Sequence, residues 1–293
     1  MGSLLLIALA GFGASFVDGA LGMGFGVTSS TLLIAVGLTP ALASASVHLA
    51  KLGTAAASGA AHYRFGNVDW AGVRRIGIPG AMGAFVGATV LSNISAKAAL
   101  PFTGTLLFVL GIYIVIRFVR GRAPRRKPGV PGLRLMVPLG LIGGFVDATG
   151  GGGWGPVTTP TLMADGRLTP ARVIGTVNTA EFIVALAASL GFLVGLGTAG
   201  IDLGIVLALL IGGVIAAPIA AYVVRHLNAR ILGVVVGNFI CLLNARILLG
   251  ALDAAPQAWW AAYGVLLVIA AMSIGFVVRI VRRDRVPAES VHA

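Results

Sequence analysis

Lys51 and Glu181 each lie near the middle of a long apolar segment of this chain. A charge at the centre of a membrane-spanning helix costs about 2.5–3.5 kcal/mol or more, so such residues are retained to pair with another group or to handle an ion. The two segments align with each other, so that Lys51 matches Glu181 and His48 matches Asn178. Matched polar positions in two apolar segments indicate one shared site.

Two interpretations of these side chains remain open. His48 and Lys51 are spaced i, i+3 and lie on one face of a helix. If the two segments face each other, Lys51 and Glu181 form an ion pair that only stabilises the fold. In the functional alternative, Lys51 holds an anion while Glu181 or His48 takes up a proton, since histidine titrates near neutral pH.

A short phrase occurs twice and places a glycine-rich break before each of these segments. The copies share an aspartate, a run of glycines and a Leu-Thr-Pro triplet, with an offset of 129 residues and Arg167 inserted in the second copy. The chain is therefore an internal duplication of a broken apolar segment. The copies read Phe16-Val17-Asp18, Gly22 to Gly26 and Leu38-Thr39-Pro40, then Phe145-Val146-Asp147, Gly150 to Gly155 and Leu168-Thr169-Pro170.

We expect the two breaks to approach each other near the middle of the membrane, where they have the composition of an anion site. Past each break a half-helix begins, near Val27 and near Pro156, and its N-terminus presents free N–H groups and the positive end of the helix dipole. Glycine lets the broken backbone approach a ligand closely, and neighbouring hydroxyls add donors. The candidate substrate-binding residues are Gly24, Phe25, Gly26, Thr28, Ser29, His48, Lys51, Gly153, Trp154, Gly155, Thr158 and Asn178.

Asp18 and Asp147 occupy matched positions just before the breaks. A short acidic side chain there can accept hydrogen bonds from loop amides, or it can bind a proton or a cation. The candidates for proton coupling are therefore Glu181, His48, Asp18 and Asp147. Glycines outside the breaks, as in Gly83–Gly87 and Gly191–Gly195, are expected to serve close helix packing.

The composition is that of a polytopic helical membrane protein. Hydrophobic residues make up 58% of the 293 residues, charged residues 10%, and the mean hydropathy is +1.00. The net charge of +12 comes from basic residues in short loops, where membrane topology accounts for it, so we expect no nucleic-acid partner. Cys241 is the single cysteine, and the sequence shows no metal, cofactor or catalytic motif, so we expect neither an enzyme nor a metal or cofactor site.

Seven apolar segments reach the roughly 20 residues that span a bilayer. The segments 3–37 and 135–164 are instead split by glycines into pieces of roughly 15 and 11 residues, against a spanning minimum of about 17. We therefore expect each of these two to be a re-entrant or discontinuous hairpin. The seven spans are 43–62, 72–92, 97–117, 173–194, 204–224, 230–250 and 258–279.

Charge placement supports the two hairpins. With both in place, all but Lys51, Lys97 and Arg246 of the 21 basic residues fall on one side, which the positive-inside rule makes cytoplasmic. The N-terminus is then outside and the C-terminus inside. The fold class is all-α, with two inverted-topology repeats, each a broken hairpin plus three spans, and one extra C-terminal span. The boundaries are 1–120 for the first repeat, 121–134 for a basic linker, 135–250 for the second repeat and 251–293 for the last span and tail.

The doubled pattern resembles the TauE/SafE sulfite exporter family. The resemblance rests on the aspartate, Gly-rich break, hydroxyl-containing stretch and Leu-Thr-Pro in both copies, and on the stretch Arg64 to Trp70 that closes the first long span. It covers nearly the whole chain. The resemblance implies export of sulfite, thiosulfate or an organosulfonate such as sulfoacetate across the cytoplasmic (inner) membrane, with proton coupling.

Our hypothesis is a secondary transporter that works by alternating access between inverted repeats. Its partners are a small sulfur oxyanion or sulfonate and the lipid bilayer, and a homodimer is left open. A passive anion channel and a membrane subunit that moves nothing are the alternatives. A channel would conduct without proton coupling.

Overall fold

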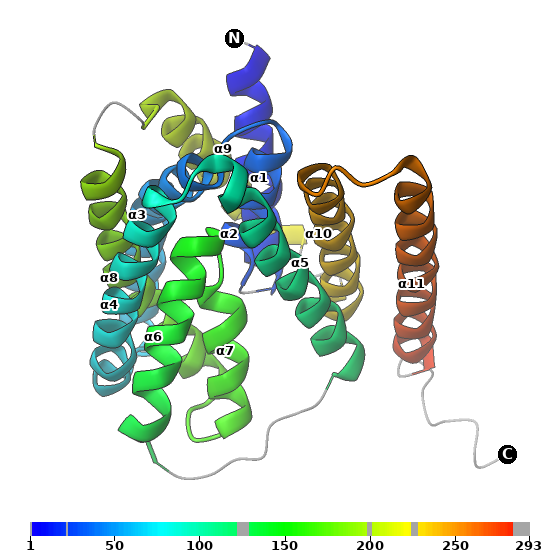
Figure 1. Ribbon diagram of the computed structural model, residues 1–293. Coiled ribbons are helices and arrows are strands. Elements are labelled where there is room, and N and C mark those ends of the chain that lie inside the picture. The colour runs from blue at the N-terminus through cyan, green and yellow to red at the C-terminus, as the bar shows by residue number, and fades with distance from the viewer. Residues whose placement is uncertain (1, 22, 122–128, 198–200, 224–227, 284–293) are drawn as a thin grey trace, which may run out of the picture.

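In the computed structural model (Figure 1), which describes residues 2–21, 23–121, 129–197, 201–223 and 228–283, all regular structure is helical. The helices are α1 (Gly2–Leu21), α2 (Phe25–Ala35), α3 (Pro40–Arg64), α4 (Trp70–Asn93), α5 (Ala96–Arg120), α6 (Leu133–Gly150), α7 (Trp154–Asp165), α8 (Pro170–Leu196), α9 (Leu203–Val223), α10 (Ala229–Ala251) and α11 (Pro256–Arg283). The expected all-helical class is confirmed. Gly22, most of the basic linker and the C-terminal tail from 284 lie outside the described residues.

Both glycine-rich stretches break a helix where the repeated phrase predicts it. The first break separates α1 from α2, and the second separates α6 from α7. Gly24 (φ 127°) and Gly151 (φ 74°) have backbone angles in the region that favours glycine. The second arms, of 11 and 12 residues, begin at Phe25 and Trp154, two residues before the predicted starts.

The expectation that both arms of each hairpin are too short to span is wrong for α6. This helix has 18 residues and is long and apolar enough to cross a bilayer. It stays helical through its glycines because they pack tightly: a methyl group on Gly140 or Gly144 would collide with backbone oxygens of α4.

Six described helices are long and apolar enough to span a membrane: α4, α5, α6, α8, α10 and α11. Of the seven predicted spans, α3 and α9 are not among them. In α3 the polar residues Ser44, His48 and Lys51 lower the mean hydropathy. Their side chains are buried within the protein rather than exposed to lipid. In α9 the apolar stretch found among the described residues is Leu203–Ala216, which is shorter than a membrane span. The chain is a multi-pass membrane protein.

The halves of the chain are interlaced. In Figure 1, α1 descends from the upper end of the molecule while α6 rises from the lower end, and both hairpins turn in the middle. α4 packs against α6 and α8, and α9 packs against α1 and α3, so each half supplies a helix that supports the other half's hairpin. This exchange suits intertwined repeats. The inverted relation between them and the domain boundaries stay predictions.

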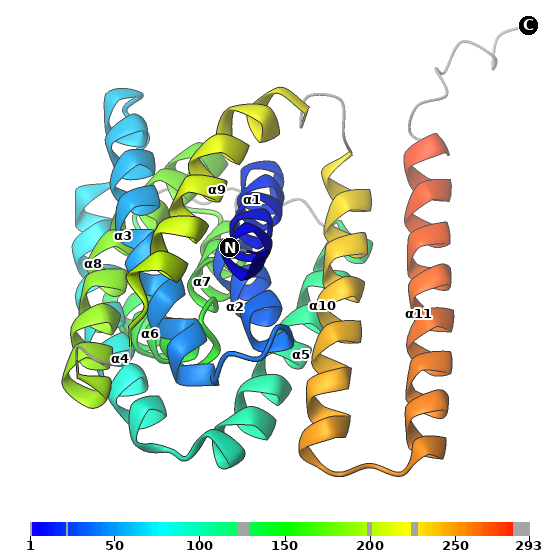
Figure 2. The same cartoon turned by 90° about the horizontal axis from the view of Figure 1, so that it is seen from above.

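Glycines outside the breaks serve close helix contacts, as expected. A methyl group on Gly87 would meet Phe145 O of α6, and one on Gly191 would meet Phe85 O of α4. Three cores result: one around Trp154 between α4, α6 and α8, one between α1, α2, α5, α9 and α10, and a smaller one between α5, α10 and α11. α11 lies along the outer side of α10 (Figure 2).

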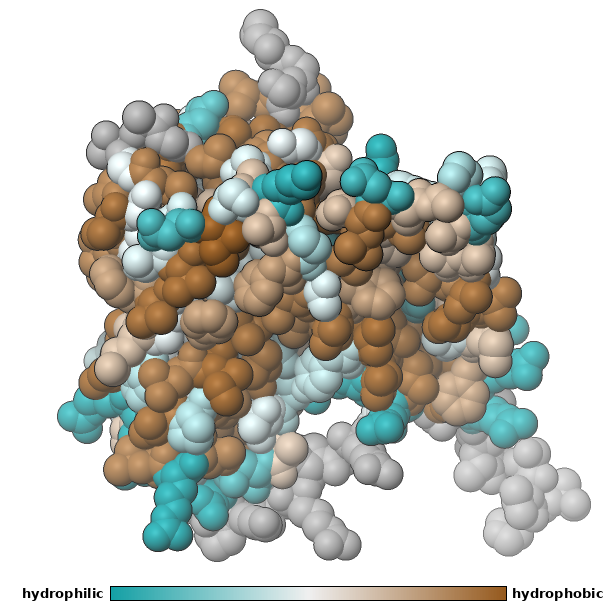
Figure 3. Space-filling view, viewed as in Figure 1, coloured by the Kyte–Doolittle hydropathy of each residue, from teal (hydrophilic) through white to brown (hydrophobic). Residues whose placement is uncertain are grey.

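The outer surface suits lipid. In Figure 3, apolar side chains cover most of the face between rims where hydrophilic side chains gather. Exposed residues of α11 such as Val268, Met272 and Phe276 are large and hydrophobic. The buried side chains of His48, Lys51 and Asp147 are therefore enclosed by helices whose outer faces suit lipid.

Candidate functional site

The two breaks are packed directly against each other. A methyl group on Gly26 would overlap Gly152, and one on Gly152 would overlap the backbone of Gly26 and Val27. We call this contact between Gly26–Val27 and Gly151–Gly152 the seam. The prediction that the two breaks approach each other is confirmed. A side chain at Gly26 or Gly152 would not fit there, which explains glycine at these two positions.

Each aspartate of the repeated phrase caps the half-helix that follows it. Asp18 Oδ1 accepts a hydrogen bond from Phe25 N (3.2 Å), and Asp147 Oδ1 accepts one from Trp154 N (3.0 Å). Both bonds join residues seven positions apart. The preceding residues, Gly24 and Gly153, have no side chain that could cap. The aspartates thus satisfy first-turn amides, and this is why the half-helices begin early.

Asp147 also binds two side chains of α3. Lys51 Nζ lies 2.9 Å from Asp147 Oδ1, and His48 Nε2 lies 3.0 Å from Asp147 Oδ2. All three side chains are at most 4% exposed, so each charge depends on its partners rather than on water. The other ring nitrogen of His48 is 2.8 Å from Ser44 O, which fixes the ring.

Lys51 joins the two halves of the chain. Besides Asp147, its ammonium contacts Glu181 Oε1 of α8 at 2.8 Å. The ion pair weighed from the sequence is therefore present. Sequence reasoning missed the pairing of Lys51 and His48 with Asp147. The signal available for it was that all three polar positions recur in the matched segments.

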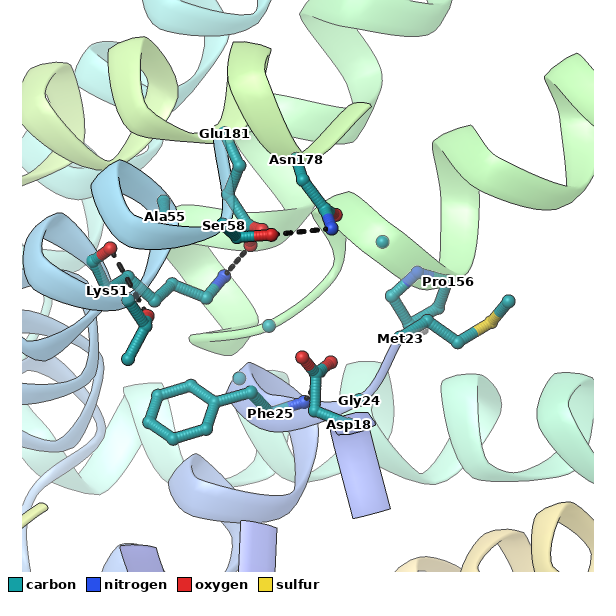
Figure 4. Close-up of a pocket in the computed structure, with 14 residues that line it drawn as sticks. Asp18, Met23, Gly24, Phe25, Lys51, Ala55, Ser58, Pro156, Asn178 and Glu181 are labelled. Atoms are coloured by element: carbon teal, nitrogen blue, oxygen red, sulfur yellow. Dashed lines mark hydrogen bonds and ion pairs between the residues drawn. The ribbon is translucent and has the colours of Figure 1, made fainter. Parts of the chain in front are cut away.

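The seam borders a small cavity of about 50 Å³, enough for a few waters or one small oxyanion. In Figure 4 the carboxyl groups of Asp18 and Glu181 and the Lys51 ammonium turn toward the same space. Asn178 Nδ2 donates to Ser58 Oγ at its edge (3.1 Å). The other lining residues are Met23, Gly24, Phe25, Gly26, Thr54, Ala55, Gly152, Gly155 and Pro156.

The chain matches the family model described as "Sulfite exporter TauE/SafE" over residues 7–247. The chain belongs to the TauE/SafE family. It is 49% identical over 251 residues to "Probable membrane transporter protein YtnM" of Bacillus subtilis (strain 168), covering 85% of this chain and 84% of that protein. It is 29% identical over 193 residues to "Probable membrane transporter protein YdhB" of the same organism, covering 65% and 77%. No solved structure matches.

The first turns of the two half-helices in this TauE/SafE protein differ. On α2, Thr28, Ser29 and Ser30 are at most 5% exposed, and their hydroxyls have no hydrogen-bond partner. On α7, the matching Thr158 hydroxyl donates to Trp154 O of its own helix. Ser30 Oγ lies against Gly151 at the opposite break. Buried hydroxyls without partners are uncommon, so α2 keeps three unused donors beside the seam, whereas Thr158 of α7 has used its own.

The predicted substrate-binding residues separate into two groups. Those that line the cavity are Gly24, Phe25, Gly26, Lys51, Gly155 and Asn178, together with the proton-coupling candidates Asp18 and Glu181. The predicted residues that do not line the cavity are Thr28, Ser29, His48, Asp147, Gly153, Trp154 and Thr158. Trp154 is fully buried in the core, and its Nε1 donates to Val177 O of α8 (3.0 Å). Trp154 therefore positions α7 in this TauE/SafE chain from behind the cavity.

Proposed function

We propose that this protein is a secondary transporter for a small sulfur-containing anion, namely sulfite, thiosulfate or a sulfonate. One observation carries the proposal: two half-helices begin at a shared seam in the interior, beside the only Lys in the described spans that is fully enclosed. Helix N-termini and an ammonium group favour oxyanions. Membership of the TauE/SafE family supports sulfur anions as the substrate class.

Transport follows from how the two halves meet. The substrate lies near Lys51 and the N-terminus of α2, and the two repeats rock about the seam so that the cavity opens to one side at a time. We place the protein in the cytoplasmic membrane with the N-terminus outside and the C-terminus inside, as its basic loops predict. Glu181, Asp18, Asp147 and His48 are the groups that could couple this movement to protons.

Flux measurements on purified protein in proteoliposomes test the proposal. Sulfite, thiosulfate and sulfoacetate are offered in turn, with and without a pH gradient, and sulfate and chloride serve as comparison anions. We expect flux of at least one sulfur anion, and accumulation against its gradient when a pH gradient is imposed. Flux that only runs downhill identifies a passive channel. No flux of any sulfur anion contradicts transport by this chain alone.

Ser30→Ala should weaken anion binding without weakening the fold. The Ser30 hydroxyl is buried without a partner, so its removal leaves no broken bond in the empty protein. A hydrogen bond to a charged group contributes about 1.5–3 kcal/mol, which corresponds to an affinity loss of about tenfold or more. The anion concentration that gives half-maximal flux measures the loss of affinity. The melting temperature is expected to stay the same or rise.

Thr161→Val is the matched control for Ser30→Ala. The Thr161 hydroxyl donates to Val157 O within α7, so this change removes a hydroxyl from the other half-helix, away from the seam. We expect unchanged half-saturation. Equal half-saturation in Ser30→Ala and wild type would exclude the α2 hydroxyl from the binding site.

A further inference from the structure

The two matched aspartates face opposite kinds of partner. Asp147 receives Lys51 and His48 from α3. At the positions of α8 that match them, the chain holds Glu181 and Asn178. Where Asp147 faces an ammonium group, Asp18 shares its cavity with a carboxyl group. A cation thus lies beside Asp147, whereas a carboxyl group shares the cavity with the matched residue Asp18.

The three carboxyl groups around Lys51 are unequally satisfied. Asp147 accepts from Lys51, His48 and Trp154 N. Glu181 has the Lys51 ammonium at 2.8 Å. Asp18 has the Phe25 amide as its hydrogen-bond donor, and in Figure 4 its carboxyl group points into the cavity. One ammonium group therefore serves two carboxylates while a third lies nearby without a cation.

We propose that a proton shared by Asp18 and Glu181 takes the place of the missing cation, and that its binding frees Lys51 for the substrate anion. The inference rests on the proposed function and deepens it. When the proton is absent, Lys51 is held between Asp147 and Glu181, as in this structure. When Glu181 is neutral, Lys51 keeps one carboxylate and has an ammonium hydrogen for the anion.

Among the residues that the structure describes, the ionisable groups lining the cavity are Asp18, Lys51 and Glu181. Asp147 and His48 are fully buried, and Asp147 binds both His48 and Lys51. The described side chains of α2 and α9 include no ionisable residue, and α7 has only Asp165, at its far end. The charged residues of α4 and α10, namely Arg74, Arg75, Arg230 and Arg246, do not line the cavity.

The direction of coupling follows. Proton and anion favour each other's binding, and by linkage each raises the affinity for the other by the same factor. Bound together, they cross the membrane in the same direction. An anion that instead displaced the proton would travel against it, so the sign of the linkage separates the two mechanisms.

The test uses the full-length protein in proteoliposomes and methanesulfonate, a sulfonate that keeps its single charge across the pH range used. Its self-exchange is measured with equal pH on both sides, at about pH 5.5 and at about pH 8. We expect the methanesulfonate concentration that half-saturates exchange to be about tenfold lower at the lower pH. Accumulation driven by an imposed pH gradient is measured in the same vesicles.

Glu181→Gln and Asp18→Asn resemble the protonated groups. The Asn side-chain oxygen can still accept the bond from Phe25 N, so the α2 cap is kept. We expect half-saturation in Glu181→Gln to be nearly equal at the two pH values and close to the low-pH value of wild type. Both variants should exchange anion but lose pH-driven accumulation. Asp165→Asn is the control. The Asp165 carboxyl group lies 3.6 Å from Arg167 and outside the cavity, so this variant should show the pH dependence and the accumulation of wild type.

Two results overturn the inference: pH dependence that persists in Glu181→Gln and Asp18→Asn, or wild-type affinity that weakens at the lower pH. Either leaves the proposed function standing, because anion exchange is still seen. Wild-type protein that exchanges neither methanesulfonate nor any anion of the flux panel contradicts the proposed function itself. Monodisperse elution of both variants from a sizing column checks that they fold.

Discussion

Lys51→Met is expected to abolish transport of every sulfur anion and to destabilise the protein. Met has a similar length but no charge, so the change removes the attraction for the anion and leaves Asp147 and Glu181 without their cation. Breaking a buried ion pair by removing one partner costs about 3–5 kcal/mol. Flux in proteoliposomes and the melting temperature in detergent measure the two effects.

A second variant separates the two effects of losing Lys51. In Lys51→Met combined with Asp147→Asn, the α6 carboxylate that Lys51 neutralises is removed together with the lysine. The Asn side-chain oxygen can still accept the hydrogen bond from Trp154 N. We expect most of the stability to return while flux stays absent. Lys97→Met removes an exposed lysine at the start of α5 and should change neither property. Restored flux in the double variant would show that Lys51 only neutralises Asp147.

Gly152→Ala is expected to disrupt the seam and stop transport. The added methyl group would overlap Gly26 C and Val27 N, which are backbone atoms and cannot rotate away. Overpacking typically costs about 1–3 kcal/mol, and a backbone collision belongs at the upper end. The half-helices must then separate, which moves both N-termini away from Lys51. Flux and melting temperature are again the measurements.

Gly13→Ala is the matched control for the seam. Gly13 lies in α1, and no atom comes within 4 Å of a methyl group built there. Alanine favours helix over glycine by about 1 kcal/mol, so this variant should be as stable as wild type or more so. Full transport by Gly152→Ala would mean that the breaks need not touch for the protein to work.

The sequence was sufficient to predict the helical class, both breaks and the seam. The reason is local: Gly24 and Gly151 need backbone angles that other residues avoid, and the repeated aspartates mark the amides that each break leaves open. Helix lengths were less predictable. Glycines that shorten a helix by propensity are kept helical in α6, because their contacts with α4 outweigh that preference.

The ion-pair network could be predicted only in part. Lys51 and Glu181 were paired from their matched positions, and the pair is present. Its extension to Asp147 depends on α3 of one half lying beside α6 of the other, which is a tertiary contact that no local pattern encodes. The unpartnered hydroxyls of α2 could not be predicted either, because the matched residues Ser29 and Thr158 both carry a hydroxyl and only the folded structure decides which of them finds an acceptor.

Locating a bound anion tests the central claim most directly. Selenite resembles sulfite in shape and charge, and its selenium can be found by anomalous scattering in crystals of the wild-type protein. We expect a selenium peak at the seam, within hydrogen-bonding reach of Lys51 Nζ and the first turn of α2, and no such peak in Lys51→Met combined with Asp147→Asn. A peak found only at the arginine-lined cavity of Arg75, Arg134 and Arg167 would contradict a substrate site between the two half-helices.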